Sequence, residues 1–259
     1  MDRMSLKVFV LVFIQVAFAG RITITSTITG ATATVTSTAG AATSSSSSTA
    51  STGSNPPAPG GDGKAPITYD QFCQAAAAYA ASGIGTPPKP SEEVYKEFVA
   101  EVCSKLSIEE AAYFMANCVW ETGGLQFTEE IACKTGTCEY KNYFGRGYIQ
   151  LTWDYNYKEA FADLKAEDAT TEDFVAKPEL VAQPKYAWKT AVWFWKKKVQ
   201  PVLKQQDAVA KGLFGYTVKV INGGLECPAN EKAKYRLAIL KEIQAKWNLK
   251  TAAPVLTGC

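Results

Sequence analysis

The stretch that decides the fold is YFGRGYIQLTWDYNY, residues 143–157, in which glycines and aromatic residues surround a few polar side chains. A carboxylate-bearing segment, WETGGLQFTEE at residues 120–130, comes shortly before it. Glu121 ends an apolar segment that opens with the capping pattern at 107–110, so its carboxyl should lie at a helix C-terminus among apolar neighbours. The negative helix end and the loss of hydration both raise the pKa of a carboxyl, which suits Glu121 to a general acid.

Two further carboxylates, Glu129 and Glu130, follow a Gly-Gly turn and should lie in a loop. A solvated carboxylate there could activate water. Two carboxylates at this spacing are more often surface charges than a catalytic pair, so this reading needs support from elsewhere in the chain.

The composition removes several classes of chemistry. The 259 residues include 27 Lys and Arg, 25 Asp and Glu, and no histidine. Without an imidazole there is no Ser-His-Asp triad, Cys-His dyad, histidine-ligated zinc or histidine base. Carboxylates then become the main acid and base groups, and they are the usual ones in glycoside hydrolysis. The net charge of +2 argues against nucleic acid as a partner.

The chain divides into three predicted segments. Residues 1–19 have basic residues before a short apolar run and a small-x-small end, which predicts a cleaved signal peptide and a secreted, extracellular protein. An uncleaved membrane anchor is the alternative, but the run at 8–18 is too short to span a bilayer. Residues 20–63 are rich in Ser and Thr and predict a disordered stalk, either O-glycosylated or a plain spacer. Residues 64–259 form the globular domain.

Local patterns in this domain are mostly helical. The Trp188, Trp193 and Trp195 stripe should pack inward, and the lysine run at 196–198 should be a solvated helix end. Extended structure is expected only at 148–153. Helices are predicted at 69–82, 91–102, 107–120, 157–164, 186–198 and 229–247.

The segment at 143–157 closely resembles the signature of the family 19 glycoside hydrolases, the plant-type chitinases. Segments 120–124, 177–195 and 221–227 resemble further motifs of that family, in the family's order. The resemblance is to the compact members that lack the long plant loops. It implies a mainly α fold of the lysozyme-like, bilobed type, with a substrate cleft and very little sheet.

The resemblance also implies roles for individual residues. It makes Glu121 the general acid and Glu130, nine residues later, the general base, with Glu129 or Glu139 as alternatives. Thr152 matches the residue that helps to hold the attacking water, although it could be an ordinary turn residue. The other matching positions line sugar subsites or support the acid: Gln150, Trp153, Tyr155, Asn156 and Asn222 for the sugars, Glu226 and Arg236 for the charged network.

These roles imply a secreted endochitinase that cleaves β-1,4 links between N-acetylglucosamine units with inversion, as a monomer and without a metal or cofactor. The alternatives are a lysozyme-like peptidoglycan hydrolase and a non-catalytic chitin-binding protein. Two positions depart from the family: Trp120 stands where it usually has His, and Tyr148 where it commonly has Pro. Both departures should affect the shape of the subsites and the rate more than the type of reaction. Loss of the histidine could also shift the pH optimum, and the alternative for Trp120 is packing in the core.

Seven cysteines leave at least one without a partner in the chain. The resemblance implies a bridge between Cys227 and Cys259. Cys133 and Cys138 are close enough in sequence to close a small loop, as a comparable pair does in relatives. Among the three remaining cysteines, we expect a bridge between Cys73 and Cys103, which would join the first two helices. Cys118 would then be a free, buried thiol.

Overall fold

The computed structural model describes residues 66–135, 138, 140 and 142–259. The predicted signal peptide and stalk, and Glu139, lie outside these residues. Within them the fold is mainly helical as predicted, and extended pairing is limited to isolated bridges. The helices, with η for 3-10 or π segments, are α1 (Tyr69–Ala77), η1 (Ala78–Ser82), α2 (Glu92–Phe98), η2 (Val99–Cys103), α3 (Ile108–Glu121), α4 (Ile131–Thr135), α5 (Asp154–Glu167), η3 (Pro178–Ala182), α6 (Pro184–Phe194), η4 (Trp195–Val199), α7 (Gln200–Gln206), α8 (Gly215–Glu226) and α9 (Glu231–Lys246).

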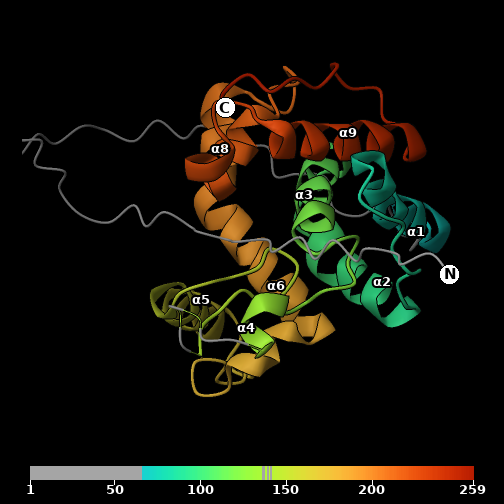
Figure 1. Cartoon of the computed structure of the whole chain (residues 1–259). Coiled ribbons are helices and arrows are strands. Elements are labelled where there is room, and N and C mark those ends of the chain that lie inside the picture. Colours follow the sequence, from blue (N-terminus) through green and yellow to red (C-terminus); the bar gives the residue numbers. More distant parts are fainter. Residues whose placement is uncertain (1–65, 136–137, 139, 141) are drawn as a thin grey trace, which may run out of the picture. The chain divides into compact units, whose positions relative to one another are not determined.

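Helix α3 is the central element. Its residues from Ala111 to Glu121 are all buried, and α9 lies across one end of it with α1 beside both (Figure 1). Ser107 caps its start by accepting the Glu110 N–H. Helix α3 is apolar and is covered by other helices, and it ends at Glu121. The carboxyl group of Glu121 therefore lies in the interior.

The core is built around aromatic rings. The Trp188 ring lies 3.9 Å from the ring of Tyr148 and 5.1 Å from that of Phe98, measured between centroids. Trp193 and Trp195 are also buried, so the predicted inward stripe is confirmed. Burial of one such side chain stabilises the fold by about 1.5–3 kcal/mol. Tyr148, one of the two departures from the family pattern, is 1% exposed and packs within this aromatic core.

One local prediction is wrong. Residues 148–153 do not form a strand: Gly147 and Gln150 have positive φ values of 73° and 54°, and a tight turn brings Leu151 back to pair with Arg146. The left-handed conformation at Gly147 favours glycine, and this residue initiates the turn. The motif at 221–227 forms the end of α8, which is kinked at Asn222, where φ is −146°.

The cysteines pair as predicted in two cases of three. Disulfides join Cys133 to Cys138 and Cys227 to Cys259. Cys73 and Cys103 are both free, so the predicted bridge between them is wrong. Cys73 lies beside Tyr69 and lines a surface hollow with Pro87 and Lys89, whereas burial raises the pKa of Cys103 to about 12. The two thiols therefore face different surroundings.

Cys118 is free and fully buried, as predicted, and burial raises its pKa well above the ordinary value. Such a thiol is a packing group rather than a nucleophile.

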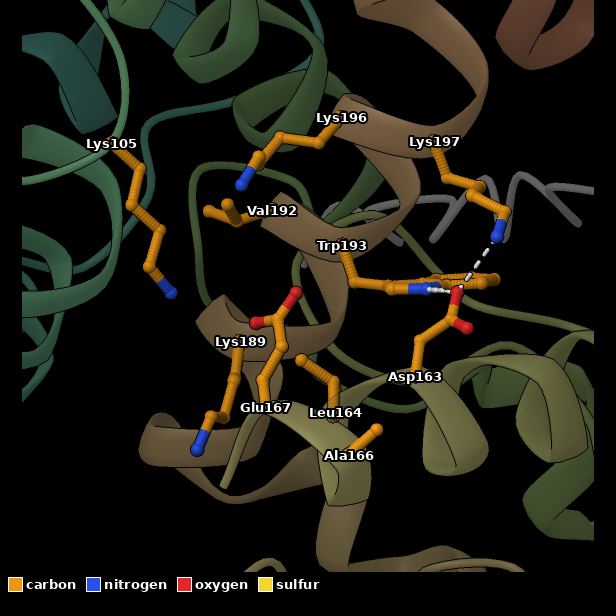
Figure 2. A pocket seen from close by; sticks show the side chains of 10 residues that line it. All are labelled: Lys105, Asp163, Leu164, Ala166, Glu167, Lys189, Val192, Trp193, Lys196 and Lys197. Carbon is orange, nitrogen blue, oxygen red and sulfur yellow. Dashed lines mark hydrogen bonds and ion pairs between the residues drawn. The ribbon is translucent and has the colours of Figure 1, made fainter.

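A cavity of about 330 Å³ lies between α5, α6 and η4, and no predicted site residue lines it (Figure 2). Its lysines are largely engaged: Lys197 pairs with Asp163 at 2.9 Å, and the same carboxylate accepts the indole N–H of Trp193. Lys198 pairs with Glu159 at 2.8 Å, so the predicted solvated lysine run is in part tied to α5. None of the described helices is long and apolar enough to cross a membrane.

Candidate active site

Glu121 ends α3 and is only 5% exposed. Its carboxylate pairs with the guanidinium of Arg236, which comes from α9. Burial raises the pKa of Glu121 to about 7; the charge of Arg236 opposes this rise and that of Glu226 adds to it. Because the desolvation of a charged carboxyl outweighs the attraction of one shared cation, Glu121 keeps its proton in weakly acidic solution.

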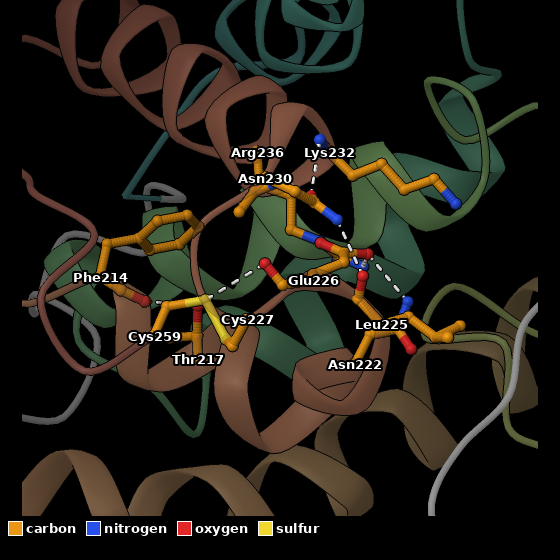
Figure 3. Close-up of a disulfide and its surroundings, with 11 residues drawn as sticks. Phe214, Thr217, Asn222, Leu225, Glu226, Cys227, Asn230, Lys232, Arg236 and Cys259 are labelled. Atoms are coloured by element: carbon orange, nitrogen blue, oxygen red, sulfur yellow. Dashed lines mark hydrogen bonds and ion pairs between the residues drawn. A yellow bond between two sulfur atoms is a disulfide. The ribbon is translucent and has the colours of Figure 1, made fainter.

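Arg236 connects two carboxylates in the interior. Its Nε donates to Glu226 Oε2 at 2.8 Å, and its Nη2 donates both to Glu226 Oε1 at 2.9 Å and to Glu121. Figure 3 shows Glu226 and Arg236 next to the disulfide between Cys227 and Cys259, which fixes the end of α8. The bidentate geometry is the strong form of a charged hydrogen bond.

The network has distinct effects on its members. Burial acts to raise the pKa of Glu226, but the charge of Arg236 and hydrogen bonds from Arg236 and Asn222 outweigh it, and the pKa is lowered. Glu226 is therefore the ionised partner and Glu121 the protonated one. Two carboxyls whose environments separate their pKa values in this way are typical of acid–base sites.

Asn222 and Asn117 complete this network. Asn222 lies at the kink of α8 and donates to Glu226 Oε1 at 2.8 Å, while its own Oδ1 is buried without a partner among the described residues. Asn117 accepts from Arg236 Nη1 at 3.2 Å and was not predicted from the sequence. One signal was available, because Asn117 is a polar residue in an apolar helix and lies four positions before Glu121, on the same face.

Glu130 and Glu129 differ in their surroundings. Glu130 is 6% exposed and accepts the N–H of Gly145 at 3.2 Å, and burial raises its pKa. Glu129 is more exposed and pairs with Arg146 at 3.4 Å. Of the two, Glu130 has no cationic partner among the described residues, whereas Glu129 is engaged in a salt bridge.

Gln150 joins the two segments that carry the site. Its side-chain Nε2 donates to the carbonyl of Phe127 at 3.3 Å and to that of Gly147 at 3.0 Å. A Cβ at Gly145 would lie 2.9 Å from Gln150 Oε1 and 3.3 Å from Glu130 Oε2. Only glycine allows this close approach, so the amide of Gln150 and the carboxylate of Glu130 can both lie next to the backbone of Gly145.

Thr152 and Asn156 are both buried and both make local hydrogen bonds. The hydroxyl of Thr152 donates to the carbonyl of Gln150 at 2.8 Å, and Asn156 Nδ2 donates to the carbonyl of Thr152 at 2.8 Å. Both therefore shape the turn, as in the alternative reading. The oxygen lone pairs of Thr152 remain able to accept a hydrogen bond from water.

Trp153 and Tyr155 form an aromatic surface. Their rings lie 6.3 Å apart at an angle of 17°, and Tyr155 is 41% exposed. Tyr140 meets Trp153 edge-on at 4.6 Å. The backbone of Trp153 has a φ of 75°, which is unusual for a large residue and marks a constrained conformation.

Comparison with known proteins identifies the family of this chain. The model of glycoside hydrolase family 19, described as chitinase class I, matches residues 58–244. The chain belongs to this family.

Among relatives of this family 19 protein, an acidic endochitinase of Dioscorea japonica is 34% identical over 183 residues, which cover 66% of this chain and 63% of that protein. Endochitinase EP3 of Arabidopsis thaliana is 38% identical over 133 residues, covering 47% of this chain and 44% of that protein. The crystal structure of chitinase C from Streptomyces griseus HUT6037 is 30% identical with a TM-score of 0.51, covering 76% of this chain and 99% of that chain. The chain thus spans less than two thirds of the length of these two plant relatives.

The predicted family and the mainly α, lysozyme-like fold are therefore confirmed. The structure brings Glu121, Glu226, Arg236 and Asn222 into one network. Glu130 and Gln150 approach Gly145 from two segments, while the other predicted site residues follow Gln150 along the chain into the start of α5: Thr152, Trp153, Tyr155 and Asn156.

One group in this family 19 protein has the composition of a metal site. Potential ligand atoms of Glu130, Cys133 and Cys138 lie within 4.8 Å of one another. Both sulfur atoms are joined in a disulfide, however, and a disulfide sulfur does not supply the thiolate that metals bind. The donor set therefore does not fit a metal ion.

Proposed function

We propose that this chain is an endochitinase that hydrolyses β-1,4 links between N-acetylglucosamine units, with Glu121 as general acid and Glu130 as general base. The observation that carries the proposal is the state of Glu121, a carboxyl at the end of a buried helix whose pKa is raised to about 7. The names of the plant relatives, which are endochitinases, point to the same substrate.

The mechanism follows from the chemistry of two carboxyls. Glu121 donates its proton to the glycosidic oxygen while Glu130 takes a proton from a water that attacks the opposite face of the sugar, which inverts the anomeric centre. The distance between the two carboxyls should then be about 6.5–9.5 Å, to leave room for the water. After donation, Glu121 is an anion beside Arg236, and this cation stabilises it until it takes up a new proton.

The remaining site residues bind and position the sugar chain. Trp153 and Tyr155 offer ring faces on which pyranose rings stack. Thr152 accepts a hydrogen bond from the attacking water. The unpartnered Oδ1 of Asn222 accepts from an acetamide N–H or a hydroxyl group. Gln150 and Asn156 support these groups from the turn and from the start of α5.

The proposal extends to the whole chain. Residues 1–19 serve as a signal peptide, residues 20–63 as a stalk, and residues 64–259 as the catalytic domain, which acts outside the cell as a monomer. The composition of the first two segments supports this division.

The test is hydrolysis of soluble chitin hexamer by the wild type, Glu121→Gln and Glu130→Gln, with anomers followed by NMR and peptidoglycan assayed in parallel. We expect α-anomeric short products from the wild type and losses of at least 100-fold in both variants. Glu129→Gln is the matched control and should retain most activity. Turnover of peptidoglycan alone would indicate a lysozyme-like enzyme, and binding without turnover would indicate a lectin.

A further inference from the structure

Trp120 is the residue immediately before the acid, and its ring lies against the cation of the network. It is 4% exposed, and the guanidinium carbon of Arg236 lies 5.8 Å from the centroid of its ring. The rings of Tyr235 and Tyr79 flank Trp120, with centroids at 5.6 and 6.3 Å. Three aromatic side chains from α3, α9 and η1 therefore gather beside the buried ion network.

This arrangement affects the hydration of the pair between Arg236 and Glu121. Arg236 is fully buried, and its hydrogen-bonding edge is taken by acceptors from α3 and α8. An aromatic ring near a guanidinium attracts it through the ring quadrupole and also excludes water. Burial is the largest cause of the raised pKa of Glu121, so the side chains that exclude water from the pair also keep this pKa high.

Other titratable and charged groups face this site from α3, η1, α8 and α9. Burial raises the pKa of Cys118 on α3 and that of Tyr79 on η1, so both stay neutral. The pKa of Glu226 on α8 is lowered, so it stays ionised. From α9 come Arg236 and Lys232, both cations, and the phenol of Tyr235. The chain has no histidine, and Glu121 is the member of this set whose pKa burial brings to about 7.

We propose that Trp120 is a positioning residue, which covers the pair between Arg236 and Glu121, keeps water away from it and so lets a share of Glu121 stay protonated near neutral pH. This inference rests on the proposed function and deepens it. A histidine at this position would add a second titrating group beside the acid, with an ordinary pKa of about 6.5. The indole adds none, so loss of activity on the alkaline side should follow a single ionisation.

The test compares pH profiles of kcat/KM on chitin hexamer for the wild type, Trp120→Phe, Trp120→Ala and Trp120→His. If Trp120→Ala admits water and lowers the pKa of Glu121 from about 7 to about 6, the protonated fraction at pH 7 falls from about one half to about one tenth. Activity should then fall about fivefold at pH 7 and by little at pH 5. Trp120→Phe should retain most of the wild-type activity at pH 7. In Trp120→His, the decline of kcat/KM on the alkaline side should no longer fit a single ionisation.

Trp247→Phe is the matched control, since Trp247 is also buried and its indole N–H donates to the backbone carbonyl of Gln71 on α1, outside the ion network. Its alkaline limb should be unchanged. A second readout does not depend on activity: titration of the Glu121 carboxyl by ¹³C NMR in the wild type and in Trp120→Phe and Trp120→His. Equal activity losses at pH 5 and pH 7, with an unmoved NMR titration, would overturn the inference. An inactive wild type would refute the proposed function alone, because the NMR titration still decides the role of Trp120.

Discussion

The raised pKa that suits Glu121 to the role of a general acid should also make the folded protein less stable at neutral pH. The variant Glu121→Gln tests this. The pKa of Glu121 is about 7 in the folded protein against an ordinary value of 4.5. Between these values the folded state keeps a proton that the unfolded state has released, so the free energy of unfolding falls as the pH rises. The difference of 7 − 4.5, at about 1.4 kcal/mol per pH unit, gives a loss of about 3 kcal/mol that is complete above pH 7.

Glutamine has the shape of a neutral carboxylic acid and still accepts from Arg236, so Glu121→Gln should match the wild type near pH 4. At pH 8 it should be more stable by about 3 kcal/mol, or about 6–12 °C in Tm for a domain of this size. Thermal unfolding by calorimetry from pH 4 to 8 measures this, with Glu242→Gln on the exposed side of α9 as control. Parallel Tm curves for the wild type and Glu121→Gln would refute the reasoning.

Three further predictions concern the surroundings of the site. Gly145→Ala places a methyl group 2.9 Å from Gln150 Oε1, and we expect a loss of about 1–3 kcal/mol in urea unfolding together with a fall in kcat. Replacement of Cys227 and Cys259 by Ser opens a bridge with a sequence separation of 32 and should cost about 4 kcal/mol in the same assay. Under denaturing, non-reducing conditions a thiol reagent should find three free cysteines, and in the native protein Cys118 should not react.

Helix positions could be predicted where the sequence carries its own start and stop signals. Thr68 caps α1 with a full capping box, and Gly83 in the left-handed conformation ends η1, which agrees with the predicted helix at 69–82. Ser107 in the same way marks the start of α3. These signals act within one turn of chain, so they can be read without knowledge of the fold.

Features that depend on contacts between distant segments could not be predicted in this way. The residues at 148–153 have an extended pattern, but the approach of Gly147 to the backbone of Ala187 selects a turn. Cys73 and Cys103 lie on adjacent predicted helices, yet the direction of each thiol depends on packing around Phe72 and Phe98. The part of Asn117 in the network requires α9 to bring Arg236 across 119 positions of sequence.

The two carboxyls of the proposed mechanism are held in different ways, and this has a consequence for how the enzyme tolerates change. Glu121 depends on contacts among α3, α8 and α9, so substitutions around it alter the core and the acid together. Glu130 depends on one backbone N–H of Gly145 and on a turn that Gln150 joins to the segment before it. Variation in the turn can therefore move the base at a smaller cost in stability, about 1–3 kcal/mol for Gly145→Ala, than the loss of Arg236 or Glu226, which leaves a buried charge unpaired at about 3–5 kcal/mol. Changes in rate and in subsite shape should accordingly accumulate on the Glu130 side of the site, while the acid side stays fixed by the stability of the fold.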